Sequence, residues 1–140
     1  MNIHYQEMTI LDYPDVIVLW QNTEGVGLSG ADTPEAISSY LARNPGHSFV
    51  ARDGEQLAGA VLCGHDGRRG YLHHLAVQPS YRRQGIGQNL VEHCMEHLKA
   101  AGIDKCHIFV YADNQDGQSF WNKTGWVLRT RLVLMSRELS

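Results

Sequence analysis

The segment from Leu75 to Leu98 combines the end of an apolar strand, a basic turn and an amphipathic helix. The strand ends at Pro79, and the turn carries Arg82 and Arg83 ahead of two glycines. The helix that follows has apolar residues at helical spacing: Leu90, Val91, Cys94, Met95 and Leu98. Because strand and helix are joined by so short a turn, the amino-terminal end of the helix must lie beside the end of the strand.

This turn has the composition of an anion-binding site. Gly85 and Gly87 allow an anion to approach the backbone N–H groups, and the first-turn amides and the helix dipole stabilise negative charge there. Two common nucleotide motifs do not fit. A dinucleotide fingerprint needs a third glycine where this chain has Leu90, and a Walker P-loop needs Gly-Lys-Ser/Thr where it has Gln88-Asn89. The alternative is a glycine turn that merely begins a helix.

Hydrophobic periodicity and turn residues predict the other elements. Strands are expected at 3–8, 48–52, 56–63, 71–77, 106–111 and 126–135. Helices are expected at 13–22, 84–101 and 114–123. One more helix begins at Asp32-Thr33-Pro34-Glu35, with Asp32 as the capping acceptor, and ends near Asn44-Pro45-Gly46. The chain shows no repeat or interior linker, so we expect a single domain over residues 1–140.

The turn also matches a family pattern. Arg82-x-x-Gly85-x-Gly87, directly after Val77-x-Pro79, resembles the acetyl-CoA pyrophosphate loop of the GCN5-related N-acetyltransferases, the GNAT family. In that family the loop is written Gln/Arg-x-x-Gly-x-Gly/Ala. The expected element order of strand, two helices, three strands, helix, strand, helix and strand is also that of the family. The resemblance is greatest to small single-domain bacterial-type members.

A second segment supports the resemblance. The last helix of the family commonly reads Asn-x-x-Ala-x-x-Phe/Leu-Tyr-x-x-x-Gly-Phe. Here Asn114, Phe120 and Gly125 match in place, whereas Gly117 replaces the alanine and Trp121 stands where tyrosine is usual. The resemblance implies an α/β (α+β) fold, in which a mixed and mostly antiparallel central sheet is flanked by about four helices.

The resemblance implies acetyl-CoA as co-substrate, with no metal. The backbone of Leu75, Ala76 and Val77 would pair with the pantetheine arm like an added strand, and the N–H of Val77, or one beside it, would donate to the oxyanion. The pyrophosphate would be held by Arg83, Gln84, Gly85, Ile86, Gly87 and Gln88. Arg82 would lie on the adenosine-phosphate side, and Asn114 and Phe120 would flank the pantetheine end.

Transfer to a primary amine requires a base, because an alkyl amine with a pKa of about 10 is mostly protonated at neutral pH. Strand alternation places Tyr71, His73 and Leu75 on one face and His74 on the other. Relatives such as the serotonin N-acetyltransferases have a histidine at the position of His73, which is therefore our candidate base. The alternative is an ordinary packed histidine.

The general acid is the second question. Many relatives use the tyrosine that Trp121 replaces, and an indole N–H can orient the leaving sulfur but cannot protonate it. Tyr111, on the neighbouring predicted strand, is a substitute donor. A thiolate with a pKa of about 8.5 can also leave unassisted.

Composition disfavours other classes. The net charge is −3 and the chain has no basic stripe, which argues against a nucleic-acid partner. No apolar run is long enough to cross a membrane, and the amino terminus does not resemble a signal peptide. Cys63, Cys94 and Cys106 are interpreted as buried free thiols of a cytoplasmic protein. His93 and His97 lack a third ligand for a metal.

Two other functions stay open from the sequence. Trp121 is compatible with a non-catalytic acyl-CoA-binding or sensor module, and a toxin that acetylates aminoacyl-tRNA is disfavoured by the acidic charge. The acceptor is expected to be a small-molecule or peptide amine. A homodimer is expected from the family alone.

Overall fold

Five strands form one mixed sheet in the order β1-β2-β3-β4-β5. The computed structural model describes residues 2–139. The strands are β1 (Ile3–Glu7), β2 (Phe49–Asp53), β3 (Gln56–His65), β4 (Gly70–Val77) and β5 (Cys106–Ile108). Strands β1 to β4 are antiparallel neighbours, and β5 runs parallel to β4. The fold class expected from the sequence is therefore confirmed.

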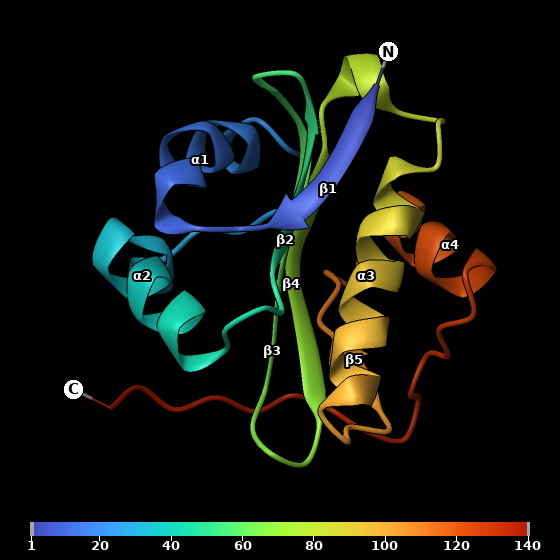
Figure 1. Cartoon of the computed structure of the whole chain (residues 1–140). Coiled ribbons are helices and arrows are strands. Elements are labelled where there is room, and N and C mark those ends of the chain that lie inside the picture. Colours follow the sequence, from blue (N-terminus) through green and yellow to red (C-terminus); the bar gives the residue numbers. More distant parts are fainter. Residues whose placement is uncertain (1, 140) are drawn as a thin grey trace. The chain divides into compact units, whose positions relative to one another are not determined.

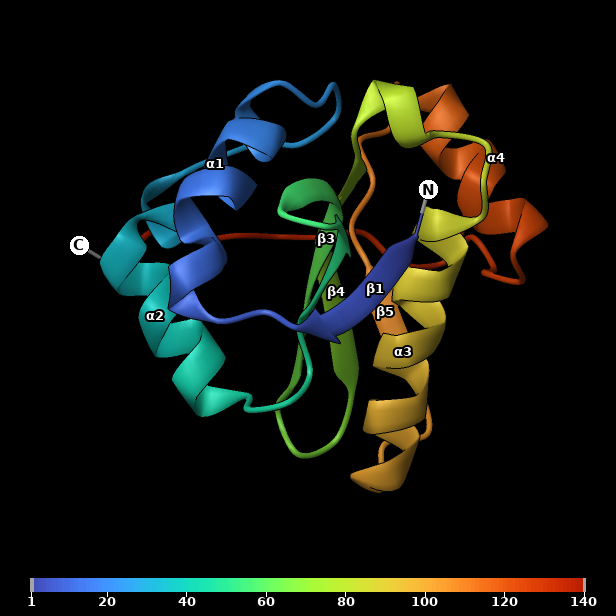
Figure 2. The same cartoon turned by 45° about the horizontal axis from the view of Figure 1, so that its top comes forward.

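Helices cover both faces of the sheet. Helices α1 (Tyr13–Gln21) and α2 (Pro34–Arg43) lie on one face and α3 (Ile86–Ala100) on the other, as Figures 1 and 2 show. Three short 3-10 helices connect them: η1 (Ile10–Asp12), η2 (Gly30–Asp32) and η3 (Pro79–Tyr81). Among residues 2–139, none of the helices has both the length and the apolar character needed to cross a membrane.

The chain divides into two compact units, Met1–Phe109 and Val110–Ser140. The first holds the sheet and α1 to α3, and the second holds α4 (Gln115–Lys123).

The first unit has an apolar core on each side of the sheet. Trp20, Leu19 and Val16 of α1 pack in one cluster with strand residues such as Val50 and Leu62. On the other side α3 buries Ile86, Leu90, Val91, Cys94 and Leu98. Strand β3 is buried on both faces, which explains its nearly continuous apolar sequence.

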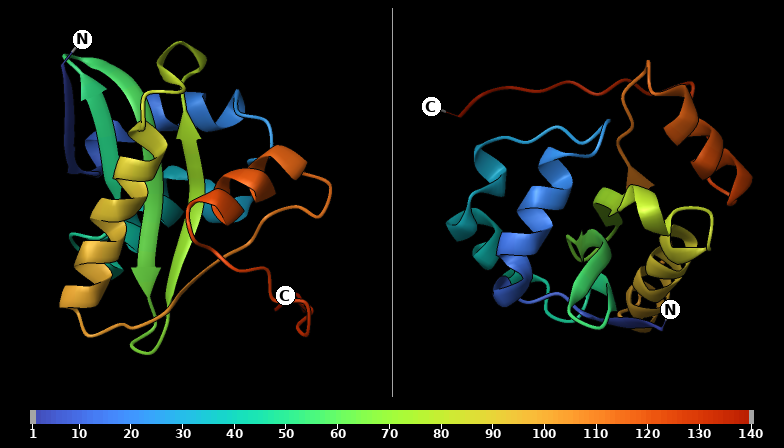
Figure 3. Two further views of the ribbon diagram at one scale, coloured as in Figure 1. Left: turned by 90° about the vertical axis from the view of Figure 1, so that its right-hand side faces the viewer. Right: turned by 90° about the horizontal axis from the view of Figure 1, so that it is seen from above.

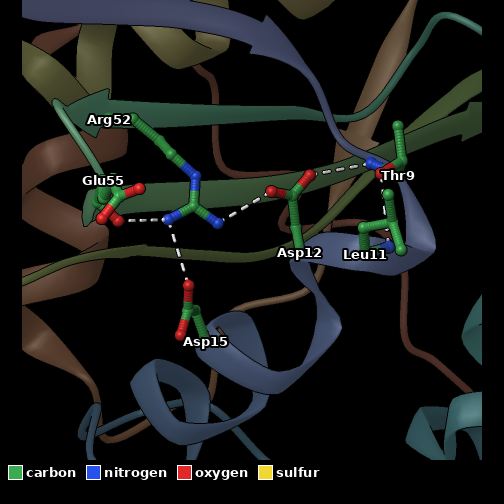
Figure 4. A network of polar contacts seen from close by, with 6 residues as sticks. All are labelled: Thr9, Leu11, Asp12, Asp15, Arg52 and Glu55. Carbon is green, nitrogen blue, oxygen red and sulfur yellow. Dashed lines mark hydrogen bonds and ion pairs between the residues drawn. The ribbon is translucent and has the colours of Figure 1, made fainter.

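A charged network joins η1, α1 and β2 (Figure 4). The two terminal nitrogens of Arg52 lie 2.8 Å from Asp12 and 3.1 Å from Asp15. Asp12 also closes a capping box, since its other oxygen accepts the Thr9 N–H at 2.9 Å. Because the Arg52 and Asp12 side chains are only 13% and 10% exposed, this pair is far less hydrated than an ordinary surface ion pair.

The final predicted strand is wrong. Residues 126–139 contain no helix or strand, and the segment after α4 runs as an irregular chain (Figure 3). The predicted strand at 106–111 shortens to β5, with half-buried rather than buried residues. A strand exists only where its backbone has a ladder partner, and an apolar sequence does not supply one. Val127, Leu128, Val133 and Leu134 are exposed.

The predicted cap of α2 is also wrong. Thr33, not Asp32, is the N-cap, and its hydroxyl accepts the Ala36 N–H at 3.1 Å. Asp32 instead closes a capping box with Ser29 around η2. Because α2 does not use the Asp32 carboxylate as its cap, one oxygen of that carboxylate can accept a hydrogen bond from a side chain of β4.

Strand β4 contains a bulge that changes which side chains share a face. Ala60 faces Ala76, whereas Leu62 faces His73, so β4 has one residue more than β3 over this stretch. The extra residue ends the simple alternation, and His74 has a left-handed backbone with φ of 56°. The prediction that His73 and His74 point to opposite faces is therefore wrong.

Candidate functional site

The loop between β4 and α3 exposes the amino-terminal end of α3. Arg83 and Gly85 both have left-handed backbones, with φ of 65° and 79°, and Gly85 is the N-cap. No side chain caps α3, so the amides of its first turn keep their hydrogen-bonding capacity for a ligand. A left-handed residue followed by helical ones makes a concave array of N–H groups, which binds anions.

Position 85 requires glycine because of its backbone conformation and not because a side chain there would collide with a neighbour. A Cβ atom added there would meet nothing within 4 Å, among the described residues, but φ lies in the region that L side chains rarely adopt. The neighbouring Arg82, Arg83, Gln84 and Gln88 are exposed. The loop therefore presents its backbone and two guanidinium groups to solvent.

The carboxyl-terminal half of β4 has an open edge. Pairing with β5 covers only Gly70 to Leu72, so within the first unit the residues from His73 to Val77 have no strand partner on that side. The Gln78 N–H donates to Ala58 O at 2.8 Å, which makes Gly59–Val77 the next, non-hydrogen-bonded pair. The N–H and C=O of Val77 thus point away from β3, and Arg82 Nε donates to Val77 O at 3.0 Å.

His73 and His74 both lie on the side of β4 that α1 and α2 cover. The His73 ring is 6.1 Å from the Tyr40 ring of α2. The His74 ring is 4.9 Å from the Trp20 ring of α1, and its Nε2 lies 2.9 Å from Asp32 Oδ1. The bulge therefore places two imidazoles side by side, with their ring centroids 6.4 Å apart.

Burial controls the charge of these groups. Burial, and then the proximity of His74, lower the pKa of His73 below 6.5, while Asp32 opposes the shift. His73 is therefore neutral at pH 7. Tyr13 donates its hydroxyl to Asp32 O at 2.6 Å, and burial, followed by the charges of Asp32 and Glu35, raises the pKa of Tyr13.

The second unit holds the other predicted site residues. Asn114 Oδ1 accepts the Gly117 N–H at 2.9 Å and so caps α4, as predicted. A Cβ at position 117 would come within 2.5 Å of Asn114 Nδ2, so glycine leaves room for this cap where the family pattern has alanine. The Trp121 ring is 5.0 Å from that of Phe120. Tyr111 is exposed.

The structure thus brings together His73, Leu75 to Val77 and the loop from Arg82 to Gln88 in one unit. Tyr111, Asn114, Phe120 and Trp121 belong to the other. Sequence reasoning missed the contacts of Asp32 and Trp20 with His74, which join residues 42 and 54 positions apart. The spacing of Ser29 and Asp32, a capping-box pattern, could have indicated that Asp32 belongs to the turn before α2.

Other candidate chemistry has a structural role. Residues 2–139 contain no group of three metal-ligating side chains, and the His93 ring stacks against Tyr5 at 5.1 Å. All three cysteines are free, but Cys106 is half-buried and not buried as expected. A hydrogen bond to Cys63 and burial raise the pKa of Cys94, and burial raises the pKa of Cys106 to about 12. The Cys94 and Cys106 thiols are therefore protonated and poor nucleophiles.

A hollow of about 460 Å³ lies at the carboxyl-terminal end of α3, where Leu98, Ile103 and Cys106 are among its lining residues. It is at the opposite end of the helix from the β4–α3 loop. The candidate site described above consists of the exposed loop and the open edge of β4.

Comparison with known proteins identifies the family of this chain. The model of the acetyltransferase (GNAT) family matches residues 15–126. An acetyltransferase of Sodalis glossinidius is 30% identical over 129 residues, which cover 91% of this chain and 89% of the relative.

Two solved structures share the fold. Ard1 from Thermoplasma volcanium superposes with a TM-score of 0.81 at 18% identity, covering 92% of this chain and 85% of that one. The PaiA N-acetyltransferase from Thermoplasma acidophilum, solved in complex with coenzyme A, has a TM-score of 0.75 at 22% identity and covers 89% of both chains.

Proposed function

Because the chain belongs to the acetyltransferase (GNAT) family and is an acetyl-CoA-dependent N-acetyltransferase, we propose that it transfers the acetyl group directly to a primary amine of a small molecule or peptide. The proposal includes one catalytic domain over residues 1–140, since the family match at 15–126 spans both units. No covalent enzyme intermediate is needed, because a thioester is already activated towards an amine.

The observation that carries the proposal is the open edge of β4 that continues into the uncapped amino-terminal end of α3. Acetyl-CoA supplies an extended arm with amide groups, a diphosphate and a reactive thioester. An open strand edge suits the arm, and exposed first-turn amides beside Arg82 and Arg83 suit the diphosphate. The outward direction of the Val77 N–H supports its proposed role as donor to the oxyanion.

The remaining binding residues are carried over from the family pattern. The proposed pyrophosphate ligands are Arg83, Gln84, Gly85, Ile86, Gly87 and Gln88. Asn114 and Phe120 are proposed at the pantetheine end. Arg82 is proposed on the adenosine-phosphate side, and its hydrogen bond to Val77 O would then be exchanged when the coenzyme binds.

The proton of the acceptor is proposed to be taken by one of the two histidines on β4, and His73 is the candidate that the sequence offers. A neutral imidazole can accept it, and His73 is kept neutral by burial. Trp121 is proposed to orient the leaving sulfur, because an indole cannot protonate it. Tyr111 is the alternative donor.

Thiol release from acetyl-CoA over a panel of amines tests the function, with calorimetry of coenzyme A binding as a parallel measurement. We expect micromolar-range binding and amine-dependent release. Folded protein that binds no coenzyme A would overturn the proposal. His73→Ala and Trp121→Tyr test the roles: a full rate at every pH in the first removes His73 as base, and faster turnover in the second shows that protonation of the thiolate limits the wild type.

A further inference from the structure

We infer that Asp32 and His74 form a carboxylate–imidazole pair, in which Asp32 is a positioning residue and His74, not His73, accepts the proton of the amine. The inference rests on the proposed function and names the group that performs one of its steps.

Asp32 is held rigidly. Its side chain is 7% exposed, against 17% for His74. Oδ2 accepts the Ser29 N–H at 2.9 Å, and Oδ1 lies 2.9 Å from His74 Nε2. A carboxylate so buried is stable only when both oxygens are hydrogen-bonded, so the position of the His74 ring is determined by the turn that ends at Asp32.

His74 is held from its backbone as well. Its φ of 56° lies in a region that residues with a side chain rarely adopt. Trp20 Nε1 donates to His74 O at 2.9 Å, and the two rings are in edge contact at 4.9 Å. The surrounding structure therefore maintains a strained backbone at the residue whose ring meets Asp32.

This geometry selects one tautomer. Because a carboxylate only accepts hydrogen bonds, His74 Nε2 must carry the proton, and Nδ1 is the basic nitrogen. Within residues 2–139, the only fully buried side-chain nitrogen or oxygen without a partner is His47 Nε2. His74 Nδ1, which accepts no hydrogen bond from these residues, therefore retains access to solvent or ligand. Among residues 2–139, no carboxylate pairs with His73.

The proton balance is simple. Nδ1 takes one proton from the ammonium form of the acceptor, and the resulting imidazolium is stabilised by Asp32. The free amine then forms the C–N bond as the C–S bond breaks. The second proton of the attacking nitrogen moves to the departing sulfur, and His74 returns its proton to solvent. The titratable groups around this step are Asp32 on η2, His73 on β4 and Tyr13 on α1, with Glu35 of α2 near Tyr13.

Asp32→Asn tests the positioning role at constant shape. The Ser29 N–H requires an acceptor, so the amide oxygen must face Ser29 and the amide nitrogen must face His74. Nε2 then becomes the acceptor and the ring proton moves to Nδ1, which blocks the basic nitrogen. We expect kcat/KM to fall about 100-fold, the contribution of a general base, with coenzyme A affinity unchanged.

The chain offers a matched control. Asp12 occupies an equivalent capping box, with Oδ2 on the Thr9 N–H at 2.9 Å and Oδ1 on Arg52 at 2.8 Å. Asp12→Asn makes the same chemical change where the partner is an arginine and not an imidazole. This control should lose stability but keep the wild-type kcat/KM and pH profile.

His74→Asn is the second variant, because asparagine tolerates a left-handed backbone. It should lose a similar factor in kcat/KM, and its pH profile should move to higher pH, because without the base only the free amine reacts. If Asp32→Asn and His74→Asn both keep rates within about twofold of wild type and the same pH profile, the pair is only structural and the inference is wrong. Wild-type protein that binds no coenzyme A would instead overturn the proposed function.

Discussion

Replacing Gly85 by alanine should separate folding from coenzyme binding, because the structure supplies a matched control at the other end of the same helix. Gly85 precedes α3 with φ of 79°, and Gly102 follows it with φ of 86°. A Cβ at either position would meet nothing within 4 Å among the described residues. Both substitutions therefore introduce the same backbone strain and no steric overlap.

The stability loss should be alike in the two variants. A left-handed alanine costs about 1–2 kcal/mol. The unfolded chain with alanine is stiffer than with glycine and loses less entropy on folding, which offsets about 0.4–1 kcal/mol of that cost. The net effect is about 1 kcal/mol, or a fall in Tm of roughly 3 °C for a chain of this size. Thermal unfolding of wild type, Gly85→Ala and Gly102→Ala measures it.

Coenzyme A affinity should differ between them. If alanine moves residue 85 out of the left-handed region, the N–H groups of the first turn of α3 no longer converge on the diphosphate. Losing one hydrogen bond to a charged group costs about 1.5–3 kcal/mol, which corresponds to an increase in Kd of about 10- to 150-fold. Calorimetry should find this increase in the Kd for coenzyme A only in Gly85→Ala. Affinity within twofold of wild type in that variant, or an equal loss in Gly102→Ala, would refute the reasoning.

Three further predictions concern stability. Arg52→Ala should cost about 3 kcal/mol, because it leaves the buried Asp12 without its partner, whereas removal of the exposed Asp15 carboxylate should cost less than about 1 kcal/mol; equal losses by urea unfolding would contradict this. Gly70→Ala should cost about 1–3 kcal/mol, since its Cβ would lie 2.6 Å from Cδ1 of the buried Leu98, and an unchanged unfolding midpoint would show that the Leu98 side chain moves away without cost. The pKa of His73 is lowered in the folded state, so the unfolded chain binds the proton more readily and the free energy of unfolding falls as pH drops below 6.5. His73→Gln should therefore lose less stability than wild type between pH 7 and pH 5. Parallel curves of unfolding free energy against pH for the two proteins would exclude this contribution.

Local sequence determined those parts of the protein whose causes lie within a few residues of each other. Helical spacing from Leu90 to Leu98, the Gly102 stop and the Asn114 cap act within single turns, so the corresponding helices could be predicted. The exposed loop between β4 and α3 could be predicted for the same reason, because β4, the glycine turn and α3 are contiguous.

Tertiary structure decided what depends on partners distant in the chain. The bulge in β4 arises from its pairing with β3, and it alone puts His73 and His74 on one face. Thr33 and not Asp32 caps α2, and the Asp32 carboxylate contacts His74, which lies 42 positions later in the chain. The residues at 126–135 are mostly apolar but have no ladder partner there. Periodicity reports which side chains avoid water, whereas backbone pairing and the direction of a carboxylate depend on which distant groups the fold places beside them.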